Sequence, residues 1–365
     1  MGLDASIPKL RIGDIVADKP IIQGGMGAGI SMANLAAAVA NAGAIGVISS
    51  IGLGVFDKTL KGDFLEANRV ALANEIRKAK SMTKGILGVN IMGAITDFDG
   101  LLQTSIDEHI DIVFLGAGLP LRNMPEKALA ERKTKFAIIV SSARAAELIC
   151  KFWQKHYHRV PDAFVVEGPM AGGHLGFSKE QIDDPAFAVE KILVEVLDVI
   201  HVFEKELNCK IPVIAAGGVY SGADICKFLR LGASGVQMGT RFVATHECDA
   251  DAAFKQAYIN CKQEDLVITN SPVGLPGRVI KNKFIEDVTL GIKKPFTCPK
   301  KCLKTCDYTQ APYCIYLALY NAKLGRLEYG FAFAGSNAYR VTEIVSVKDL
   351  IDELMADCAK AMESK

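Results

Sequence analysis

A single histidine stands in a glycine-rich loop directly after an apolar run, and this is the strongest chemical signal in the chain. The segment is Ala163-Phe-Val-Val-Glu-Gly-Pro-Met-Ala-Gly-Gly-His-Leu-Gly176, in which Gly172 and Gly173 precede His174. Glycines let the backbone approach a flat or phosphorylated ligand without obstruction from side chains. We therefore expect His174 to face a ligand and to handle protons there; the alternative is a structural histidine that caps a turn.

Two further glycine-rich segments follow apolar runs later in the chain. Ile214-Ala-Ala-Gly-Gly-Val-Tyr-Ser-Gly222 contains Gly217 and Gly218, and a second segment reads Gly235-Val-Gln-Met-Gly-Thr240. In such a position, bare backbone amides beside the amino terminus of the next helix can hold an anion. The pair of segments predicts a phosphate site, and ordinary tight turns are the alternative.

Four cysteines lie close together in the last quarter of the chain: Cys298, Cys302, Cys306 and Cys314. If this segment is helical, the first three share one face and could bind zinc or an iron–sulfur cluster. Their spacing is neither that of a standard zinc pair nor that of a ferredoxin. Free thiols that pack inside the protein are therefore the alternative to a metal or iron–sulfur site.

The elements that position these residues are short β-branched runs, each followed by a segment with helical periodicity. The runs are residues 20–23, 45–49, 86–91, 112–115, 136–140, 163–166, 212–215 and 235–238. The clearest amphipathic segments are residues 32–41, 66–80, 143–156 and 187–207. This alternation predicts an α/β fold, a (β/α)8 or TIM barrel, whose active-site loops follow the carboxyl ends of the strands.

The alternation stops near Arg241, and a segment with several prolines follows. We predict that residues 8–245 and 323–365 form the barrel. Residues 246–322, which include the cysteine cluster, are predicted to form a small lid or substrate domain.

Composition excludes several classes of function. The chain has 365 residues, is 50% hydrophobic and carries a formal net charge of +1, so it can bury a full core but has no overall field for nucleic acid. No charged region followed by an apolar run opens the chain, and Asn41 and several glycines interrupt its most apolar stretch. We expect a cytoplasmic protein with neither a nucleic-acid nor a membrane partner.

The first predicted strand carries a more specific signal. Pro20-Ile-Ile-Gln-Gly-Gly-Met-Gly27 followed by Ala38-Val-Ala-Asn-Ala-Gly-Ala-Ile-Gly46 resembles the opening of the nitronate monooxygenase family, once called 2-nitropropane dioxygenases. Further similar segments are residues 88–90, 118–120, 167–176 and 237–240. The resemblance spans about residues 20–345 and implies a barrel that binds FMN. The same family pattern covers flavin-dependent enoyl-acyl-carrier-protein reductases and NADH:quinone reductases.

The resemblance also implies roles for individual residues. His174 would be the catalytic residue beside the reacting carbon. The cofactor-binding residues would be Gly24, Gly25, Met26, Asn90, Glu167, Gly172, Gly173, Gly217, Gly218, Gln237, Met238, Gly239 and Thr240. Ser336 and Asn337 would border the flavin pocket, or alternatively cap a helix.

The main functional hypothesis is an FMN-dependent oxidoreductase that oxidises alkyl nitronates with O2 to carbonyl compounds and nitrite. The alternative is an NAD(P)H-dependent FMN reductase of an enoyl thioester or a quinone on the same scaffold. A third hypothesis is a flavin- or phosphate-binding sensor in which His174 is structural. Both enzymatic hypotheses imply a small-molecule substrate and differ in the electron donor.

Overall fold

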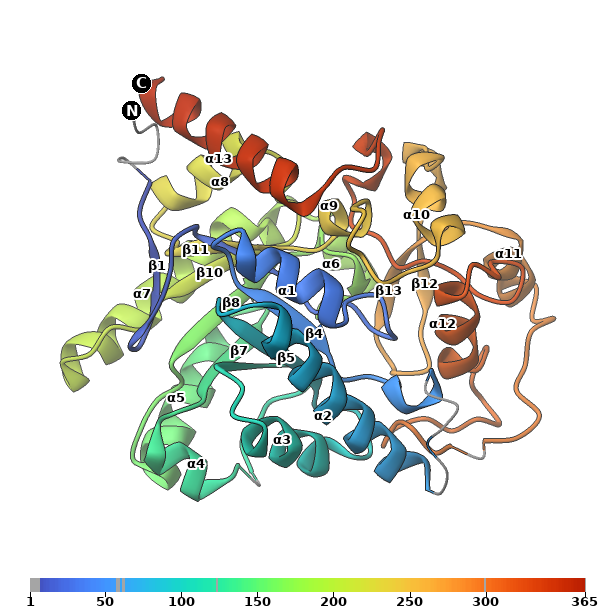
Figure 1. Ribbon diagram of the computed structural model, residues 1–365, viewed down its shortest axis with the longest axis horizontal. Coiled ribbons are helices and arrows are strands. Elements are labelled where there is room, and N and C mark those ends of the chain that lie inside the picture. Colours follow the sequence, from blue (N-terminus) through green and yellow to red (C-terminus); the bar gives the residue numbers. More distant parts are fainter. Residues whose placement is uncertain (1–6, 57–59, 61–62, 123, 299, 365) are drawn as a thin grey trace.

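Eight parallel strands form a barrel in the computed structural model, which describes residues 7–56, 60, 63–122, 124–298 and 300–364 (Figure 1). In the order β3-β11-β10-β8-β7-β6-β5-β4, they are β3 (Ile21–Gln23), β11 (Gly235–Met238), β10 (Val213–Ala216), β8 (Ala163–Glu167), β7 (Lys135–Val140), β6 (Ile112–Gly116), β5 (Leu87–Met92) and β4 (Gly46–Ser49). The barrel closes between β3 and β4, the first and last strands of this order. There, Ile45 N donates to Ile21 O (3.0 Å) and Gln23 N donates to Ile45 O (2.9 Å).

The predicted TIM-barrel fold is therefore confirmed. Each predicted strand is present, and no strand end differs from its prediction by more than one residue. The agreement arises because strands of a parallel barrel are buried on both faces and so read as short apolar runs.

Helices cover the outside of the barrel (Figure 1). They are α1 (Ala33–Asn41), α2 (Phe64–Met82), α3 (Phe98–Asp107), α4 (Glu126–Glu131), α5 (Ala143–Tyr157), α6 (Lys179–Ile182), α7 (Val189–Leu207), α8 (Gly222–Arg230), α9 (Thr240–Val243) and α13 (Val347–Glu363). Helix α13 packs tightly along α8, where a Cβ on Gly222 would lie 2.2 Å from Leu354 O. Within the described residues, no helix combines the length and the apolar character that crossing a bilayer requires.

Alternate residues of each strand face either the helices or the barrel interior. In β8, Phe164 and Val166 pack in the cluster under the helices, whereas Val165 packs in the interior cluster. An amino-terminal hairpin of β1 (Leu10–Ile12) and β2 (Ile15–Ala17) joins the interior cluster, and Leu10 approaches Gly235 at the start of β11. The hairpin thus closes the amino-terminal end of the barrel, and the loops at the carboxyl end are left to form a site.

A smaller unit lies to one side of the barrel (Figure 1). Its elements are α10 (Ala252–Ile259), β12 (Leu266–Asn270), β13 (Pro276–Ile280), α11 (Lys283–Thr289) and α12 (Ile315–Lys323). Strand β13 also pairs with β9 (Gly173–His174), so a loop of the barrel completes a three-stranded sheet of this cap. Phe284, Tyr313 and Phe331 pack in a separate apolar core there. That core reaches past residue 322, where the predicted lid ends, and the predicted domain boundaries stay a prediction.

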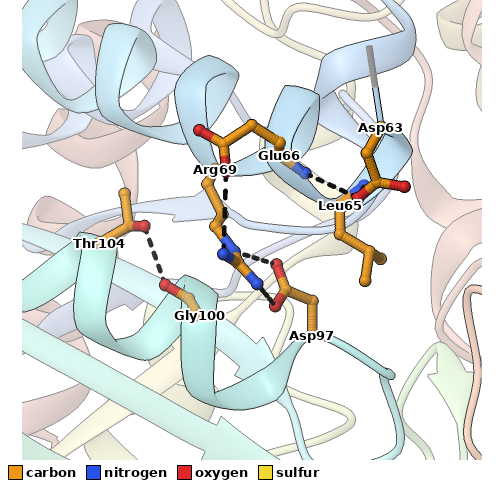
Figure 2. Close-up of polar contacts among 7 residues, drawn as sticks. All are labelled: Asp63, Leu65, Glu66, Arg69, Asp97, Gly100 and Thr104. Carbon is orange, nitrogen blue, oxygen red and sulfur yellow. Dashed lines mark hydrogen bonds and ion pairs between the residues drawn. The ribbon is translucent and has the colours of Figure 1, made fainter.

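An ion pair joins α2 to the start of α3 (Figure 2). Arg69 Nε donates to Asp97 Oδ2 at 2.8 Å, and Arg69 Nη2 donates to Asp97 Oδ1 at 2.5 Å. The Asp97 side chain is only 7% exposed. Gly100 leaves room for the pair, because a Cβ there would lie 2.3 Å from Arg69 Nε.

The variant Asp97→Asn is expected to lower the free energy of unfolding by about 1 kcal/mol, because the amide keeps the shape of the carboxylate but not its charge beside a partly exposed arginine. Urea unfolding followed by circular dichroism measures the change. The control Glu108→Gln removes the carboxylate from the more exposed pair with Arg77 and should have a smaller effect. A stability of Asp97→Asn equal to that of the parent would contradict a stabilising role for this pair.

Candidate active site

A cavity of about 270 Å³ opens at the carboxyl ends of the barrel strands. Every residue predicted to contact the ligand lines it: Gly24, Gly25, Met26, Asn90, Glu167, Gly172, Gly173, His174, Gly217, Gly218, Gln237, Met238, Gly239 and Thr240. The loops of the barrel thus bring together residues that are more than two hundred positions apart in the chain. Their individual roles stay predictions.

The alternation along the strands explains why three polar side chains face this cavity. In β8, Ala163 and Val165 belong to the interior cluster, and Glu167 continues the series at the carboxyl end of the strand. Asn90 in β5 and Gln237 in β11 lie in the same way between outward-facing apolar residues. The barrel core is therefore apolar in its depth and polar at its mouth.

Glycines form much of the cavity wall. A Cβ on Gly25 would lie 2.4 Å from Asn90 Cβ, so no larger residue fits there without a shift. Gly217 and Gly218 have φ angles of +87° and +92°, in the left-handed region that L side chains rarely adopt. These glycines leave the backbone bare toward the cavity, as a cradle for a planar or phosphorylated ligand requires.

Residues near the end of the chain support the two glycine-rich loops that are predicted to bind phosphate. Gly335 N donates to Thr240 Oγ1 at 3.1 Å, and Asn337 Nδ2 donates to Gly218 O at 2.7 Å. Ser336 N donates to Met170 O at 3.1 Å. Ser336 and Asn337 therefore support the loops that border the cavity, and the final long helix begins later, at Val347.

The amino terminus of α8 is already occupied by a carboxylate of the chain. It therefore cannot help the Gly217–Gly218 loop to bind an anion, as the sequence had suggested. The Asp224 carboxylate accepts hydrogen bonds from Tyr220 N (3.0 Å) and Ser221 N (2.9 Å). Ser221 Oγ in turn accepts a bond from Asp224 N. An anion at this end of the cavity would depend on the amides of Gly217 and Gly218 rather than on those of the first turn of α8.

His174 lies at the wall of the cavity, between the barrel and the cap. Its Nε2 is 2.7 Å from Ser271 Oγ, and its ring centroid is 5.0 Å from that of Phe333 in an edge arrangement. Burial lowers the pKa of His174 to about 4. The imidazole is therefore neutral at pH 7 and can accept a proton or donate a hydrogen bond.

Two residues that no local motif marks support the histidine loop. Ser271 occupies the turn between β12 and β13, where its hydroxyl meets the His174 ring. Arg278 in β13 is buried, and its Nη1 donates to Pro169 O at 2.6 Å and to Ala171 O at 2.9 Å. Both residues lie in the predicted lid, about a hundred positions from the loop. Their roles follow from the pairing of β13 with β9, for which the sequence contains no local signal.

The four cysteines do not form the predicted metal site. In the described residues around them, Cys298, Cys302 and Cys306 lie outside any helix, and α12 begins only after Cys314. Over the described part of the chain, no three Cys, His, Asp or Glu side chains are placed so that they could hold a metal ion. All four are free thiols, and burial raises the pKa of Cys302 to about 12. The expectation of a shared helical face is wrong because this segment runs as an irregular strap, along which Cys302 O accepts a hydrogen bond from Thr96 N.

Comparisons with known proteins identify relatives of this chain. The family profile described as nitronate monooxygenase matches residues 9–357. A probable nitronate monooxygenase of Staphylococcus haemolyticus is 29% identical over 304 residues, which cover 73% of this chain and 76% of that protein. The (3aS,4S,5R,7aS)-5-hydroxy-7a-methyl-1-oxo-octahydro-1H-indene-4-carboxyl-CoA dehydrogenase of Mycobacterium tuberculosis is 29% identical over 278 residues, covering 75% of this chain and 66% of that protein.

A solved structure extends the similarity to the whole fold. FabK from Thermotoga maritima superposes with a TM-score of 0.73 at 28% identity, and the match covers 95% of this chain and 94% of that one. The barrel and the cap thus recur together in a related protein.

Proposed function

Because the chain belongs to the nitronate monooxygenase family and is an oxidoreductase, we propose that it is an FMN-dependent enzyme that oxidises alkyl nitronates with O2 to carbonyl compounds and nitrite. The observation that carries the proposal is a neutral, half-buried histidine at the wall of a small glycine-lined cavity. A nitronate is the deprotonated form of a nitroalkane, so a neutral nitroalkane must lose a proton from its α-carbon before it can be oxidised in this way. A single titratable side chain beside a flavin would suffice for it.

The residues around the cavity fit FMN. Gly24, Gly25 and Gly173 present backbone to the cavity, and nothing lies within 4 Å of the Cβ that Gly173 lacks. Gly217 and Gly218 would meet the phosphate end with bare amides. Bound FMN would take two electrons from the substrate and pass them to O2, which is chemistry that no side chain supplies.

His174 would handle the proton of the substrate. With the Nε2 proton donated to Ser271 Oγ, Nδ1 keeps a free lone pair and can accept a proton from the α-carbon of a neutral nitroalkane. With the opposite tautomer, Nδ1–H can donate a hydrogen bond to an anionic nitronate. Because Ser271 can either donate or accept, the same contact supports both states of the ring.

The size and lining of the cavity favour a small substrate. Its volume of about 270 Å³ is below the roughly 300–1,000 Å³ that ligand pockets usually span, and bound FMN would fill much of it. Among the described residues that line it, Glu167, His174 and Tyr258 carry titratable side chains, and none is a lysine or arginine. An alkyl nitronate matches this space better than the long acyl chain of a thioester does.

One observation favours a second candidate, an FMN-dependent reductase of enoyl thioesters. The relative from Mycobacterium tuberculosis is named for an acyl-CoA substrate and is as similar to this chain as the nitronate monooxygenase relative is, at 29% identity each. In this candidate NAD(P)H is the electron donor, and His174 would supply rather than remove a proton.

Product analysis separates the two candidates. Purified protein reconstituted with FMN is supplied in air with propyl-2-nitronate, and nitrite and acetone are measured. The proposal predicts that both are released together and in equal amounts. Absence of nitrite, together with NADH or NADPH oxidation that depends on an enoyl thioester, would overturn it in favour of the reductase.

A further inference from the structure

Glu167 holds an ionisable group at the cavity with no partner to compensate its charge. It is the last residue of β8, and Ala216 lies beside it in the neighbouring strand β10. Its carboxyl group lines the cavity, and among the described residues no hydrogen bond or ion pair to that group is found. Glu167 is therefore a candidate for a group that changes charge when the cavity fills.

Among the described residues that line the cavity, none supplies a positive charge near pH 7. Of the other titratable side chains that line the cavity, His174 is neutral, because burial lowers its pKa to about 4. Tyr258 is neutral as well, because burial raises its pKa, and its hydroxyl donates to Phe333 O. The buried cation Arg278 directs Nη1 to two backbone carbonyls of the loop that follows Glu167.

Burial in this surrounding raises the pKa of Glu167 to about 7. The carboxyl group is thus neutral in much of the protein at and below pH 7, and ionised above that pH. Two features of FMN would oppose the ionised form. The flavin would displace water from the carboxyl group, and the phosphate brings a charge of about −1.5 to −2 into the same cavity.

We infer that FMN binding is linked to a proton on Glu167: the cofactor binds to the protein in which this side chain is a neutral carboxylic acid, and ionisation of Glu167 weakens binding. The inference rests on the proposed FMN site and adds a regulation of it by pH. Affinity should be insensitive to Glu167 below about pH 7. Above that pH it should fall by up to about tenfold per pH unit, because one proton must then be taken up with each cofactor.

Isothermal titration calorimetry of the apoprotein with FMN at pH 8, in two buffers with different ionisation enthalpies, measures the number of protons taken up per FMN bound. The parent is expected to take up close to one proton per FMN bound, whereas Glu167→Gln should take up none. The affinity of Glu167→Gln for FMN should also stay constant between pH 7 and 9, where the FMN phosphate is already ionised. Glu180→Gln, the same change at an exposed position of the following segment, is the matched control and should behave as the parent.

The possible results separate this inference from the proposed function. FMN binding by the parent without proton uptake at pH 8 would overturn the inference and leave the cofactor assignment in place. Failure of FMN to bind at any pH would overturn both. If Glu167→Gln does not fold, the proton count and the pH dependence of the parent alone decide the matter.

Discussion

The variant His174→Ala is expected to turn over neutral nitroalkanes about 10²- to 10⁴-fold more slowly than the parent while keeping its FMN. The reason is that, among the described residues, the cavity has no other neutral base: Glu167 is a carboxyl and Tyr258 a phenol. With preformed nitronates the loss should be smaller, because no proton at carbon then has to be removed. Steady-state rates with both substrate forms, together with the flavin absorbance of the purified variant, measure the two effects.

The pH profile gives a second test of the same histidine. Because burial lowers the pKa of His174 to about 4, its neutral form is lost only as pH falls through about 4. The rate should therefore fall on the acid side near pH 4, and not near the pH of about 6.5 at which an exposed histidine titrates. The control His201→Ala removes a side chain that is 56% exposed and should change neither rate nor profile. Unchanged turnover of His174→Ala with FMN bound would remove His174 from the mechanism.

The variant Gly218→Val is expected to weaken FMN binding by about tenfold or more, equivalent to at least about 1.4 kcal/mol. Gly218 has a φ of +92°, and a Cβ there would lie 3.1 Å from both Cβ and Sδ of Met170. A branched side chain would strain the backbone and occupy the wall at which the phosphate is expected. Fluorescence quenching of FMN by the apoprotein measures the affinity.

A matched control separates backbone strain from loss of the cradle. Gly291 also has a left-handed φ, of +71°, but it is exposed in the cap and nothing lies within 4 Å of its absent Cβ. Gly291→Val should therefore leave FMN affinity unchanged. Full FMN occupancy in Gly218→Val would contradict the assignment of this loop to the phosphate.

The barrel could be predicted from the sequence because its signals are local. A strand such as Phe136 to Val140 is apolar throughout, and amphipathic stretches such as 143–156 follow at regular intervals. The site was predictable for the same reason. In this fold, the residues after each strand meet at one end of the barrel, so glycine pairs distant in sequence could be assigned to one cavity.

The cap could not be predicted in the same way. Strand β13 pairs with β9, only two residues long, in the histidine loop. That pairing brings Ser271 and Arg278 to the loop across about a hundred positions. Neither residue stands in a recognisable motif, and such a short strand has no periodicity to read.

The cysteine cluster shows the opposite error, since close spacing alone indicated a metal site. Close spacing brings side chains together only if the local structure turns them to one side. Residues 300–306 are irregular, and their backbone is hydrogen-bonded to the loop after β5, with Lys304 N donating to Ala94 O at 2.9 Å. The strap is thus anchored by its backbone, and among the described residues its thiols form no group that is placed to hold a metal ion.

The central claim, an FMN enzyme that takes electrons from nitronates, is tested most directly by the visible spectrum of the purified protein without oxygen. A flavin spectrum should be present, or should appear once FMN is added to the apoprotein. The account predicts that an alkyl nitronate bleaches the flavin bands and that NADH and NADPH do not. Bleaching by NADH or NADPH alone, or no flavin spectrum even after FMN is added, would contradict it.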